Sequence, residues 1–299
     1  EPATIRDTLG MPAEEYAARF GVRLYEQAEE MVEREQLDTV VLIARHTEHA
    51  AWAERLATLR VNLFIPKTFA TTMEDAERIV AAGRRNGVKV AVGPSARFLP
   101  PTMGAHGALQ RGTIGAPFSL RICHHHGTID AFGPRDWYRE AAEGGPELSL
   151  GWYGVDLALY FMGDDWASVY AEYGNYASPD SPFMDCGRIL LRSKSGALAS
   201  FDMYFCNRVA YPAWQMEIVG PGGVISLHRT ESDPLKTVLS LDGPRGHERL
   251  PIPERTPGWE TYWIDDLLAG RTPTISGAVA SRITRITLAA AESARTGRP

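Results

Sequence analysis

Residues 61–93 read VNLFIPKTFATTMEDAERIVAAGRRNGVKVAVG, two short apolar runs on either side of a helical stretch. The runs VNLFIP (61–66) and VKVAVG (88–93) are typical of strands that are buried on both faces of a parallel sheet. Between them, Thr71 or Thr72 can cap a helix whose first turn is acidic. A strand–helix–strand unit of this kind predicts two parallel strands joined by a right-handed crossover.

The residues before this unit repeat its pattern. The run DTVVLIA (38–44) predicts another buried strand, and the stretch 48–60 that follows it is helical. Two more helices are predicted over residues 12–20, which Gly21 would end, and over residues 26–35. The first third of the chain is therefore predicted to be α/β.

From about residue 115 the pattern changes to short runs with period-two alternation, which predict strands. A helix is predicted over residues 151–163 and another over 276–297, and the turn sequences SKSG and GPGG separate neighbouring runs. The alternating runs are FSLRICHHHG, WASVYAEYGNYA, GRILLRSKSGALASFDMYFCN, WQMEIVGPGGVISLHR and TVLSLDG. This part is predicted to be α+β with a large open antiparallel sheet.

The composition is that of an ordinary globular protein, with 44% hydrophobic and 23% charged residues, and 299 residues favour two domains. A net charge of -6 gives no footprint for nucleic acid, and no apolar run is long enough for a membrane span. The first residues show no secretory signal. Three widely spaced cysteines, Cys123, Cys186 and Cys206, suit a reducing compartment. We therefore expect a cytoplasmic protein with a small-molecule partner.

Five stretches, taken in order, resemble the Gfo/Idh/MocA family of oxidoreductases. They are FGVRLYEQAEEMVEREQLDTVVLIARHTEHAAWAERLA, NLFIPKTFATTMEDAERIVAAGRRNGVKVAVGPSARFLP, RGTIGAPFSLR, GGPELSLGWYGVDLALYFMG and SGAVASRITRITLAAAESARTG. The resemblance implies a Rossmann-like dinucleotide-binding domain over residues 1–98 and a domain with a large open antiparallel sheet over 99–275. Residues 276–299 would form a closing helix that packs back towards the first domain.

One feature of the family's pattern is missing from the printed sequence. No G-x-G-x-x-G stands between a strand and a helix, and GPGG at 220–223 lies in the antiparallel part, where it predicts a turn. In the family that loop belongs to a first strand–helix unit, upstream of the piece that corresponds to residues 12–20. We therefore expect the Rossmann-like domain to be N-terminally incomplete. Either this unit is absent from the printed sequence or the protein has lost it. A protein that truly lacks the loop should bind NAD(P) poorly, because the cofactor's pyrophosphate then lacks its helix N-terminus.

The resemblance implies hydride transfer between NAD or NADP and a secondary alcohol or ketone of a sugar, cyclitol or related polyol. It also implies a homo-oligomer, a dimer or tetramer, that assembles through the antiparallel sheet. Two alternatives remain open. One is a non-redox binding or regulatory derivative of the fold, and the other is NAD-assisted cleavage of a glycosidic bond through a keto intermediate.

The resemblance makes Lys67 and Tyr153 the catalytic candidates. Lys67 lies in Pro66-Lys67-Thr68, where the family has E-K-P, at the carboxyl end of a predicted strand, where ligands of open α/β sheets bind. Its ammonium could polarise the reacting hydroxyl and relay the proton, unless it is a surface lysine. Tyr153 stands where many members carry a catalytic histidine. A phenol can exchange the proton if a neighbouring Lys⁺ lowers its pKa, and packing is the alternative.

Four further positions near these residues are candidates for substrate binding. Ser149, one helical turn before Tyr153, replaces the family's acidic residue, and Asp156 on the same helix face is the remaining carboxylate. Asp156 would bind substrate or orient the helix. Arg97 follows the strand at 88–93 and would bind substrate or the cofactor's carboxamide, or pair with an acidic neighbour. Trp137 could form a sugar-stacking wall.

The triplet His124-His125-His126 alternates between the two faces of a predicted strand, so that His124 and His126 would line the substrate pocket. A zinc site is disfavoured because no carboxylate or cysteine partner is evident, and the family needs no metal. On the cofactor side, Arg45, His46 and His49 directly follow the strand at 38–44 and resemble the family's loop beside the dinucleotide. Pro66 and Lys67 would complete the cofactor-binding set, with capping or packing as the alternative for His49.

Overall fold

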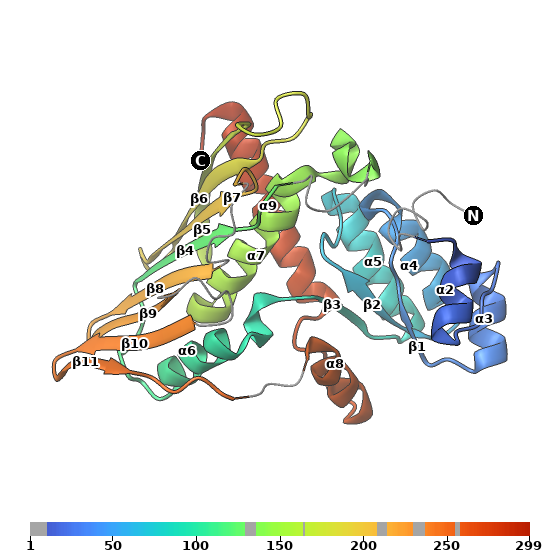
Figure 1. Cartoon of the computed structure of the whole chain (residues 1–299), viewed down its shortest axis with the longest axis horizontal. Coiled ribbons are helices and arrows are strands. Elements are labelled where there is room, and N and C mark those ends of the chain that lie inside the picture. Colours follow the sequence, from blue (N-terminus) through green and yellow to red (C-terminus); the bar gives the residue numbers. More distant parts are fainter. Residues whose placement is uncertain (1–10, 129–135, 164, 208–213, 230–236, 255–257) are drawn as a thin grey trace.

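The computed structural model describes residues 11–128, 136–163, 165–207, 214–229, 237–254 and 258–299. These residues form a three-stranded sheet and a separate eight-stranded sheet, with helices between and around them (Figure 1). The predicted fold class, a Rossmann-like parallel sheet followed by a large open sheet, is confirmed.

The small sheet is parallel and has the order β1-β2-β3. Its strands are β1 (Thr39–Val41), β2 (Asn62–Pro66) and β3 (Val90–Gly93), and its helices are α2 (Ala13–Phe20), α3 (Ala28–Glu35), α4 (His49–Ala57) and α5 (Met73–Asn86). Thr72 caps α5 by accepting a hydrogen bond from the backbone N–H of Asp75 (3.1 Å), and Gly87 ends the helix in the left-handed conformation. Both signals act as the sequence predicts.

The strand predicted over residues 38–44 is shorter than its apolar run. Leu42 still donates its N–H to the carbonyl of Phe64 (2.8 Å), but β1 itself ends at Val41. Val41 is 51% exposed and Ile43 is 75% exposed. The expectation that this run is buried on both faces is therefore wrong, because Val40 and Leu42 are buried on one side while Val41 and Ile43 are exposed on the other.

The large sheet has the order β11-β10-β9-β8-β4-β7-β6-β5. Its strands are β4 (Ser119–His125), β5 (Trp166–Gly174), β6 (Cys186–Ser193), β7 (Leu198–Tyr204), β8 (Trp214–Gly220), β9 (Gly223–Arg229), β10 (Thr237–Gly243) and β11 (Gly246–Arg249). Every neighbouring pair is antiparallel except β4 and β7, which run parallel. The predicted antiparallel sheet is thus corrected at this pair.

The GPGG sequence forms the turn between β8 and β9, as predicted. Gly223 has φ +143°, and a Cβ placed there would lie 2.3 Å from the carbonyl oxygen of Asp242. Only glycine fits this close approach of two backbones.

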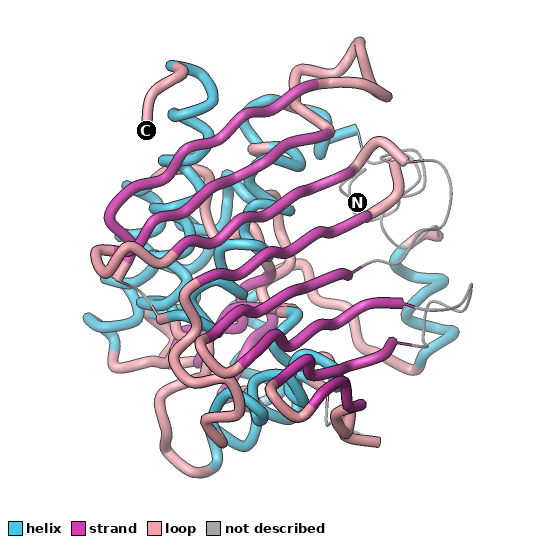
Figure 2. The backbone as a smooth tube through the Cα atoms, turned by 90° about the vertical axis from the view of Figure 1, so that its left-hand side faces the viewer, coloured by secondary structure: helices cyan, strands magenta, loops and turns pink. Residues whose placement is uncertain are grey.

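The helices that touch the large sheet lie on one of its faces, and the other face carries no helix in the described residues (Figure 2). They are α6 (Pro100–Gln110), which the sequence did not predict, α7 (Gly145–Met162) and α9 (Gly277–Thr296). Helix α8 (Trp259–Leu268) packs instead on the small sheet, where Trp259 stacks on Phe64 at 4.3 Å. Short 3₁₀ turns are η1 (His46–Glu48), η2 (Ala96–Phe98), η4 (Asp136–Arg139) and η5 (Ala141–Glu143).

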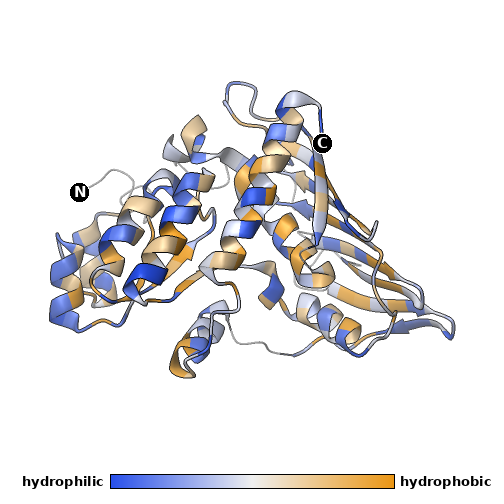
Figure 3. Ribbon diagram, turned by 180° about the vertical axis from the view of Figure 1, so that it is seen from behind, coloured by the Kyte–Doolittle hydropathy of each residue, from blue (hydrophilic) through white to orange (hydrophobic). Residues whose placement is uncertain are grey.

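Helices α7 and α9 belong to the hydrophobic cores of both sheets. In α7, Leu157 packs in the core of the large sheet and Trp152 in that of the small sheet. In α9, Ala290 and Ile283 divide in the same way, and hydrophobic patches alternate with hydrophilic ones along the helix (Figure 3). The two cores are therefore joined by shared helices. Among the helices described, none is both long and apolar enough to cross a membrane.

Candidate active site

The carboxyl ends of β1, β2 and β3 meet at one edge of the small sheet, and this edge faces α7 and β4. Ligands of open α/β sheets bind at such an edge. The predicted site residues come from the segments that follow these three strands and from the elements of the large sheet opposite them.

Lys67 directly follows β2 and lies at this edge of the small sheet, against Tyr153 of α7. Its backbone N–H donates to the carbonyl of Gly93 (2.8 Å), and its Nζ lies 4.8 Å from the centre of the Tyr153 ring. The Lys67–Thr68 peptide bond is cis. Burial lowers the pKa of the Lys67 amine to about 8, and no carboxylate of the described residues forms an ion pair with it. Near pH 8 this amine therefore exists in both its charged and its neutral form.

Tyr153 projects from α7 and is fixed by aromatic contacts. Its ring stands edge-on to His124 (centroids 5.7 Å apart, 88°) and to Trp214 (5.8 Å, 82°). Burial, and to a smaller extent the charge of Asp156, raises the pKa of the Tyr153 phenol to about 12. The lowered pKa that the sequence made a condition for Tyr153 as a proton carrier is not found, because burial raises the pKa of the phenol although Lys67 lies beside the ring.

His124 in β4 and His126 directly after it lie on the side that turns towards Lys67, as predicted. The His124 ring is stacked on Trp214 (centroids 3.7 Å apart, 8°). The His126 ring stands edge-on to that of His124, with their centroids 5.1 Å apart. Burial lowers the pKa of both rings, His124 well below its usual value and His126 to about 4, and the charge of Lys67 adds to this. Both are therefore neutral at physiological pH. His125 points the other way and stacks on Tyr204.

Arg97 and Asp156 bind each other in the interior. Arg97 Nε donates to Asp156 Oδ1 (2.8 Å), and Nη2 lies 2.7 Å from the same oxygen. The hydroxyl of Ser95 donates to Asp156 Oδ2. Burial raises the pKa of Asp156, and the charge of Arg97 opposes that effect. The geometry matches the ion-pair alternative stated for Arg97 and the helix-orienting alternative stated for Asp156. A direct contact of either with substrate stays a prediction, as it does for Ser149, which is fully buried in α7.

The loop after β1 brings His46 and His49 together with Trp137. His46 donates from Nδ1 to the carbonyl of Glu143 (2.8 Å) and meets Trp137 edge-on at 5.3 Å. Burial lowers the pKa of His46 to about 4. His49 hydrogen-bonds the carbonyl of Phe69 through Nδ1 (3.1 Å) and lies 5.8 Å from the His46 ring.

Arg45 lies apart from this group and pairs with Glu140 at 3.0 Å on the surface. A cofactor contact for Arg45, Pro66 or His49 stays a prediction.

Two side chains of the candidate site were not predicted from the sequence, the partly buried Trp214 and the buried Glu143. Trp214 begins β8 two residues before the core residue Met216, so period-two alternation could have placed it on the inner face. Glu143 is one of several charged residues between Arg139 and Glu147, it precedes two glycines, and nothing in its local pattern indicates burial.

Buried polar atoms in the segments that follow β1 and β2 suit the carboxamide end of a dinucleotide. The Oγ1 atom of Thr68, after β2, and the Nε2 atom of His49, after β1, are buried and have no hydrogen-bond partner in the described residues. Buried polar atoms normally have a partner, so these atoms fit the amide or hydroxyl groups of a ligand. The residues present fit that end of NAD(P), whereas the printed sequence offers no glycine loop for the pyrophosphate.

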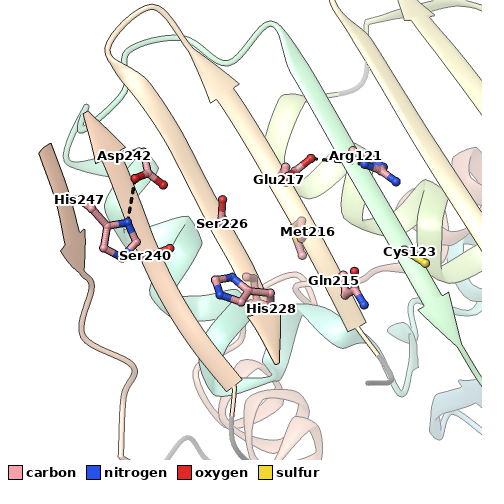
Figure 4. A pocket seen from close by; sticks show the side chains of 11 residues that line it. Arg121, Cys123, Gln215, Met216, Glu217, Ser226, His228, Ser240, Asp242 and His247 are labelled. Atoms are coloured by element: carbon pink, nitrogen blue, oxygen red, sulfur yellow. Dashed lines mark hydrogen bonds and ion pairs between the residues drawn. The ribbon is translucent and has the colours of Figure 1, made fainter. Parts of the chain in front are cut away.

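A cavity of about 320 Å³ lies elsewhere, on the helix-free face of the large sheet (Figure 4). None of the predicted site residues lines it. Its lining is mostly polar: Arg121, Cys123, Gln215, Met216, Glu217, Ser226, Leu227, His228, Ser240, Asp242 and His247. In the described ranges, no group of three or more His, Cys, Asp or Glu side chains is arranged to hold a metal ion.

Known proteins resemble the chain along most of its length. It is 28% identical over 292 residues to a D-apiose dehydrogenase of Paraburkholderia graminis, covering 93% of the chain and 77% of that protein. It is 26% identical over 192 residues to a myo-inositol 2-dehydrogenase of Thermotoga maritima, covering 63% of the chain and 56% of that relative.

Solved structures share the fold. An oxidoreductase from Agrobacterium radiobacter, solved in complex with NAD⁺, L-tartaric acid and magnesium, superposes with a TM-score of 0.81 at 23% identity, covering 95% of this chain and 86% of that one. An aldose-aldose oxidoreductase from Caulobacter crescentus, complexed with glycerol, gives a TM-score of 0.82 at 21% identity, with coverages of 95% and 87%.

Two family models match successive parts of the sequence. The model described as an oxidoreductase family with an NAD-binding Rossmann fold matches residues 1–94, and the model described as the GFO/IDH/MocA C-terminal domain matches residues 103–226. With both halves matched in order, and with the fold that the two sheets display, the chain belongs to the Gfo/Idh/MocA family of oxidoreductases.

Proposed function

We propose that this protein transfers a hydride between NAD or NADP and a secondary alcohol or ketone of an uncharged sugar, cyclitol or related polyol. The observation that carries the proposal is Lys67, a half-buried amine without a carboxylate partner in the described residues, placed between the carboxyl end of β2 and the ring of Tyr153. Family membership and the two dehydrogenases that the chain resembles support the same reaction.

Lys67 manages the proton of the reacting hydroxyl. Oxidation of a secondary alcohol removes a hydride from carbon and a proton from oxygen, and the nicotinamide supplies the hydride acceptor. A general base works best when its pKa is near the operating pH, and the Lys67 pKa of about 8 meets this requirement. In the neutral form the amine accepts the hydroxyl proton, and in the charged form it returns a proton to the ketone oxygen.

Tyr153 acts as a hydrogen-bond donor in this scheme. Because its phenol has a pKa of about 12, it stays protonated at neutral pH and is a poor base. The Lys67 ammonium lies over the face of the Tyr153 ring, a cation–π contact that favours the charged amine when it is shielded from water. We therefore assign proton acceptance to Lys67, and a positioning role to Tyr153.

The charges of the candidate site residues favour an uncharged substrate. His124 and His126 are neutral, and Arg97 is occupied by Asp156, so Lys67 is the one cation in reach of a ligand among the described site residues. Neutral imidazoles and the indole of Trp214 or Trp137 suit hydroxyl groups and the apolar face of a sugar ring. D-apiose and myo-inositol, for which two relatives are named, are uncharged polyhydroxy compounds.

We also propose the division into residues 1–98, 99–275 and 276–299, a cytoplasmic location, and a homo-oligomer that assembles through the helix-free face of the large sheet. For the oligomer, the support is the side chains on that face. It carries Arg121 and Glu217 side by side, as Figure 4 shows, and the exposed Leu190 and Leu198. Mixed charges with exposed leucines are a composition that a second copy of the same face can complement.

The proposal is tested by titrating the purified chain with NAD⁺ and NADP⁺, followed by assays with a panel of aldoses, inositols and sugar acids. We expect saturable binding of one dinucleotide and turnover of a neutral polyol, with turnover lost in Lys67→Met. The matched control is Lys89→Met, which removes the lysine just before the amino end of β3, whereas Lys67 follows the carboxyl end of β2. Binding without turnover of any alcohol would favour a non-redox derivative, and failure to bind either dinucleotide would overturn the proposal for the chain as printed.

A further inference from the structure

Glu143 is a buried carboxylate, 1% exposed, at the junction of the two sheets. It ends η5, just before α7, but its side chain contacts the loop after β1. Its Oε1 accepts a hydrogen bond from the hydroxyl of Thr47 (2.8 Å), and its Oε2 accepts one from the N–H of Thr47 (3.4 Å). Its carbonyl oxygen accepts from Nδ1 of His46 (2.8 Å).

Such a carboxylate is costly to bury. A buried charge normally needs a cation and several hydrogen bonds, and removal from water disfavours it otherwise. Among the described residues, the one basic group at ion-pair distance is His46, whose Nδ1 lies 3.9 Å from Oε2. His46 is neutral at physiological pH, so the carboxylate is held mainly by Thr47. A buried carboxylate whose hydrogen bonds both go to one residue of another segment points to a role in geometry.

The backbone carbonyl of Glu143 also decides the tautomer of His46. A carbonyl oxygen can only accept, so Nδ1 of His46 must carry the hydrogen, and Nε2 is then the acceptor nitrogen. Trp137 and His49 pack against the same ring and restrict its rotation. Lys67 lies close enough for its charge to act on His46. The backbone of Glu143 thus sets the tautomer of a neutral imidazole beside the proposed base, and its side chain holds the neighbouring Thr47 in place.

We propose that Glu143 is a positioning residue that fastens the loop 45–47, on the cofactor side, to the start of the helix that carries Tyr153. This inference rests on the proposed function for its catalytic consequence, but the contact itself does not depend on it. Hydride transfer requires two bound molecules to be held about 3–3.5 Å apart, and a displacement of 1 Å can cost about 10²-fold in rate. The contact of Glu143 with Thr47 joins the loop 45–47 to the start of α7 and so controls that separation.

A second contact joins the same two segments and provides a matched control. Arg45 pairs with Glu140 at 3.0 Å, but their side chains are 34% and 50% exposed. Exposed pairs contribute little to stability or order because water screens them. Glu140→Gln therefore removes a carboxylate three residues from Glu143 without removing a buried contact.

The experiment compares Glu143→Ala, Glu143→Gln, Thr47→Val, the Glu143→Ala/Thr47→Val double variant and Glu140→Gln. We expect Glu143→Ala to lower kcat by about 10²-fold with the KM for the alcohol and the Kd for the dinucleotide changed much less. Glu143→Gln retains an accepting oxygen and should recover most of the loss. Thr47→Val should lower kcat in the same direction, and the double variant should be no worse than Glu143→Ala, because both act through one contact.

The second readout is the side-chain ¹⁵N NMR spectrum of His46 in the ligand-free protein. The wild type and Glu140→Gln should show the single tautomer with hydrogen on Nδ1. Glu143→Ala keeps the backbone carbonyl but releases Thr47, so the loop should move away from that carbonyl and His46 should show a mixture of tautomers. A folded Glu143→Ala with unchanged kcat and an unchanged spectrum would overturn the proposal, as would effects of Glu143→Ala and Thr47→Val that simply multiply. If the wild type oxidises no alcohol, the proposed function fails, and the His46 spectrum still decides whether Glu143 fastens the loop.

Discussion

Glu147 offers a measurement in which stability depends on a single buried carboxyl. It lies in the first turn of α7, where Oε1 accepts the N–H of Met184 (2.6 Å) and Oε2 is buried without a hydrogen-bond partner in the described residues. The hydroxyl of Tyr173 is buried nearby and also lacks such a partner. Burial raises the pKa of Glu147 from 4.5 to about 7, and the charge of Asp185 adds to this.

The direction and size of the change in folding stability with pH follow from proton linkage. Between pH 4.5 and 7 the folded chain binds the proton that the unfolded chain has lost, so stability falls as the pH rises through this window. At 1.36 kcal/mol per pH unit, the difference corresponds to about 3 kcal/mol. Glu147→Gln cannot ionise, so it should match the wild type near pH 5 and exceed it by about 3 kcal/mol at pH 8.5.

The assay is denaturant unfolding of both proteins at the two pH values, with Glu26→Gln, an exposed carboxylate, as the control. The control should follow the wild type at both values. The reasoning fails if Glu147→Gln is no more stable than the wild type at pH 8.5, or if its advantage is the same at pH 5. In the first case the folded protein tolerates the charge, and in the second the gain has nothing to do with ionisation.

Three further predictions concern the candidate active site. The rate of alcohol oxidation should rise with pH through about 8, as Lys67 becomes neutral, and Lys67→Met should lose about 10²-fold or more in kcat, which a kcat–pH profile checks. Tyr153→Phe should keep oxidation within about tenfold of the wild type, because general-base catalysis typically contributes 10²–10⁴-fold and the phenol is not the base; a loss of 10³-fold would contradict this. Asp156→Asn should cost about 3–5 kcal/mol of folding stability, because it leaves the Arg97 guanidinium buried without its counter-charge, and urea unfolding would refute this with a loss below about 1 kcal/mol.

Local signals in the sequence predicted the elements that position the site. The apolar runs at 61–66 and 88–93 form β2 and β3, and helix α5 begins after Thr72 and ends at Gly87. Helix α6 escaped prediction because Pro100 and Pro101 resemble a loop, although proline is well tolerated in the first turn of a helix. The parallel pairing of β4 with β7 joins residues about 80 positions apart, and such pairing leaves no local pattern.

The site was predicted in part for the same reason. Lys67, Tyr153, His124 and His126 do come together, because strand ends and strand faces fix their directions. Which charges pair depends on distances across the fold, and the sequence alone left Arg97 and Asp156 open. The raised pKa of Tyr153 could not be predicted either, since it depends on how completely the ring is enclosed.

The shared position of α9 also bears on how the chain folds during synthesis. Its N-terminal residues Ala280 and Ile283 complete the core of the small sheet, and the carbonyl of Ile275 accepts the N–H of Val92. About 180 residues separate that strand from the helix. At a synthesis rate of about 5–20 residues per second, β3 and α5 wait on the order of 10–40 s on the ribosome before their covering helix exists. During that interval the apolar side of the small sheet is exposed, so a nascent chain of this protein should be a client for chaperones until α9 emerges.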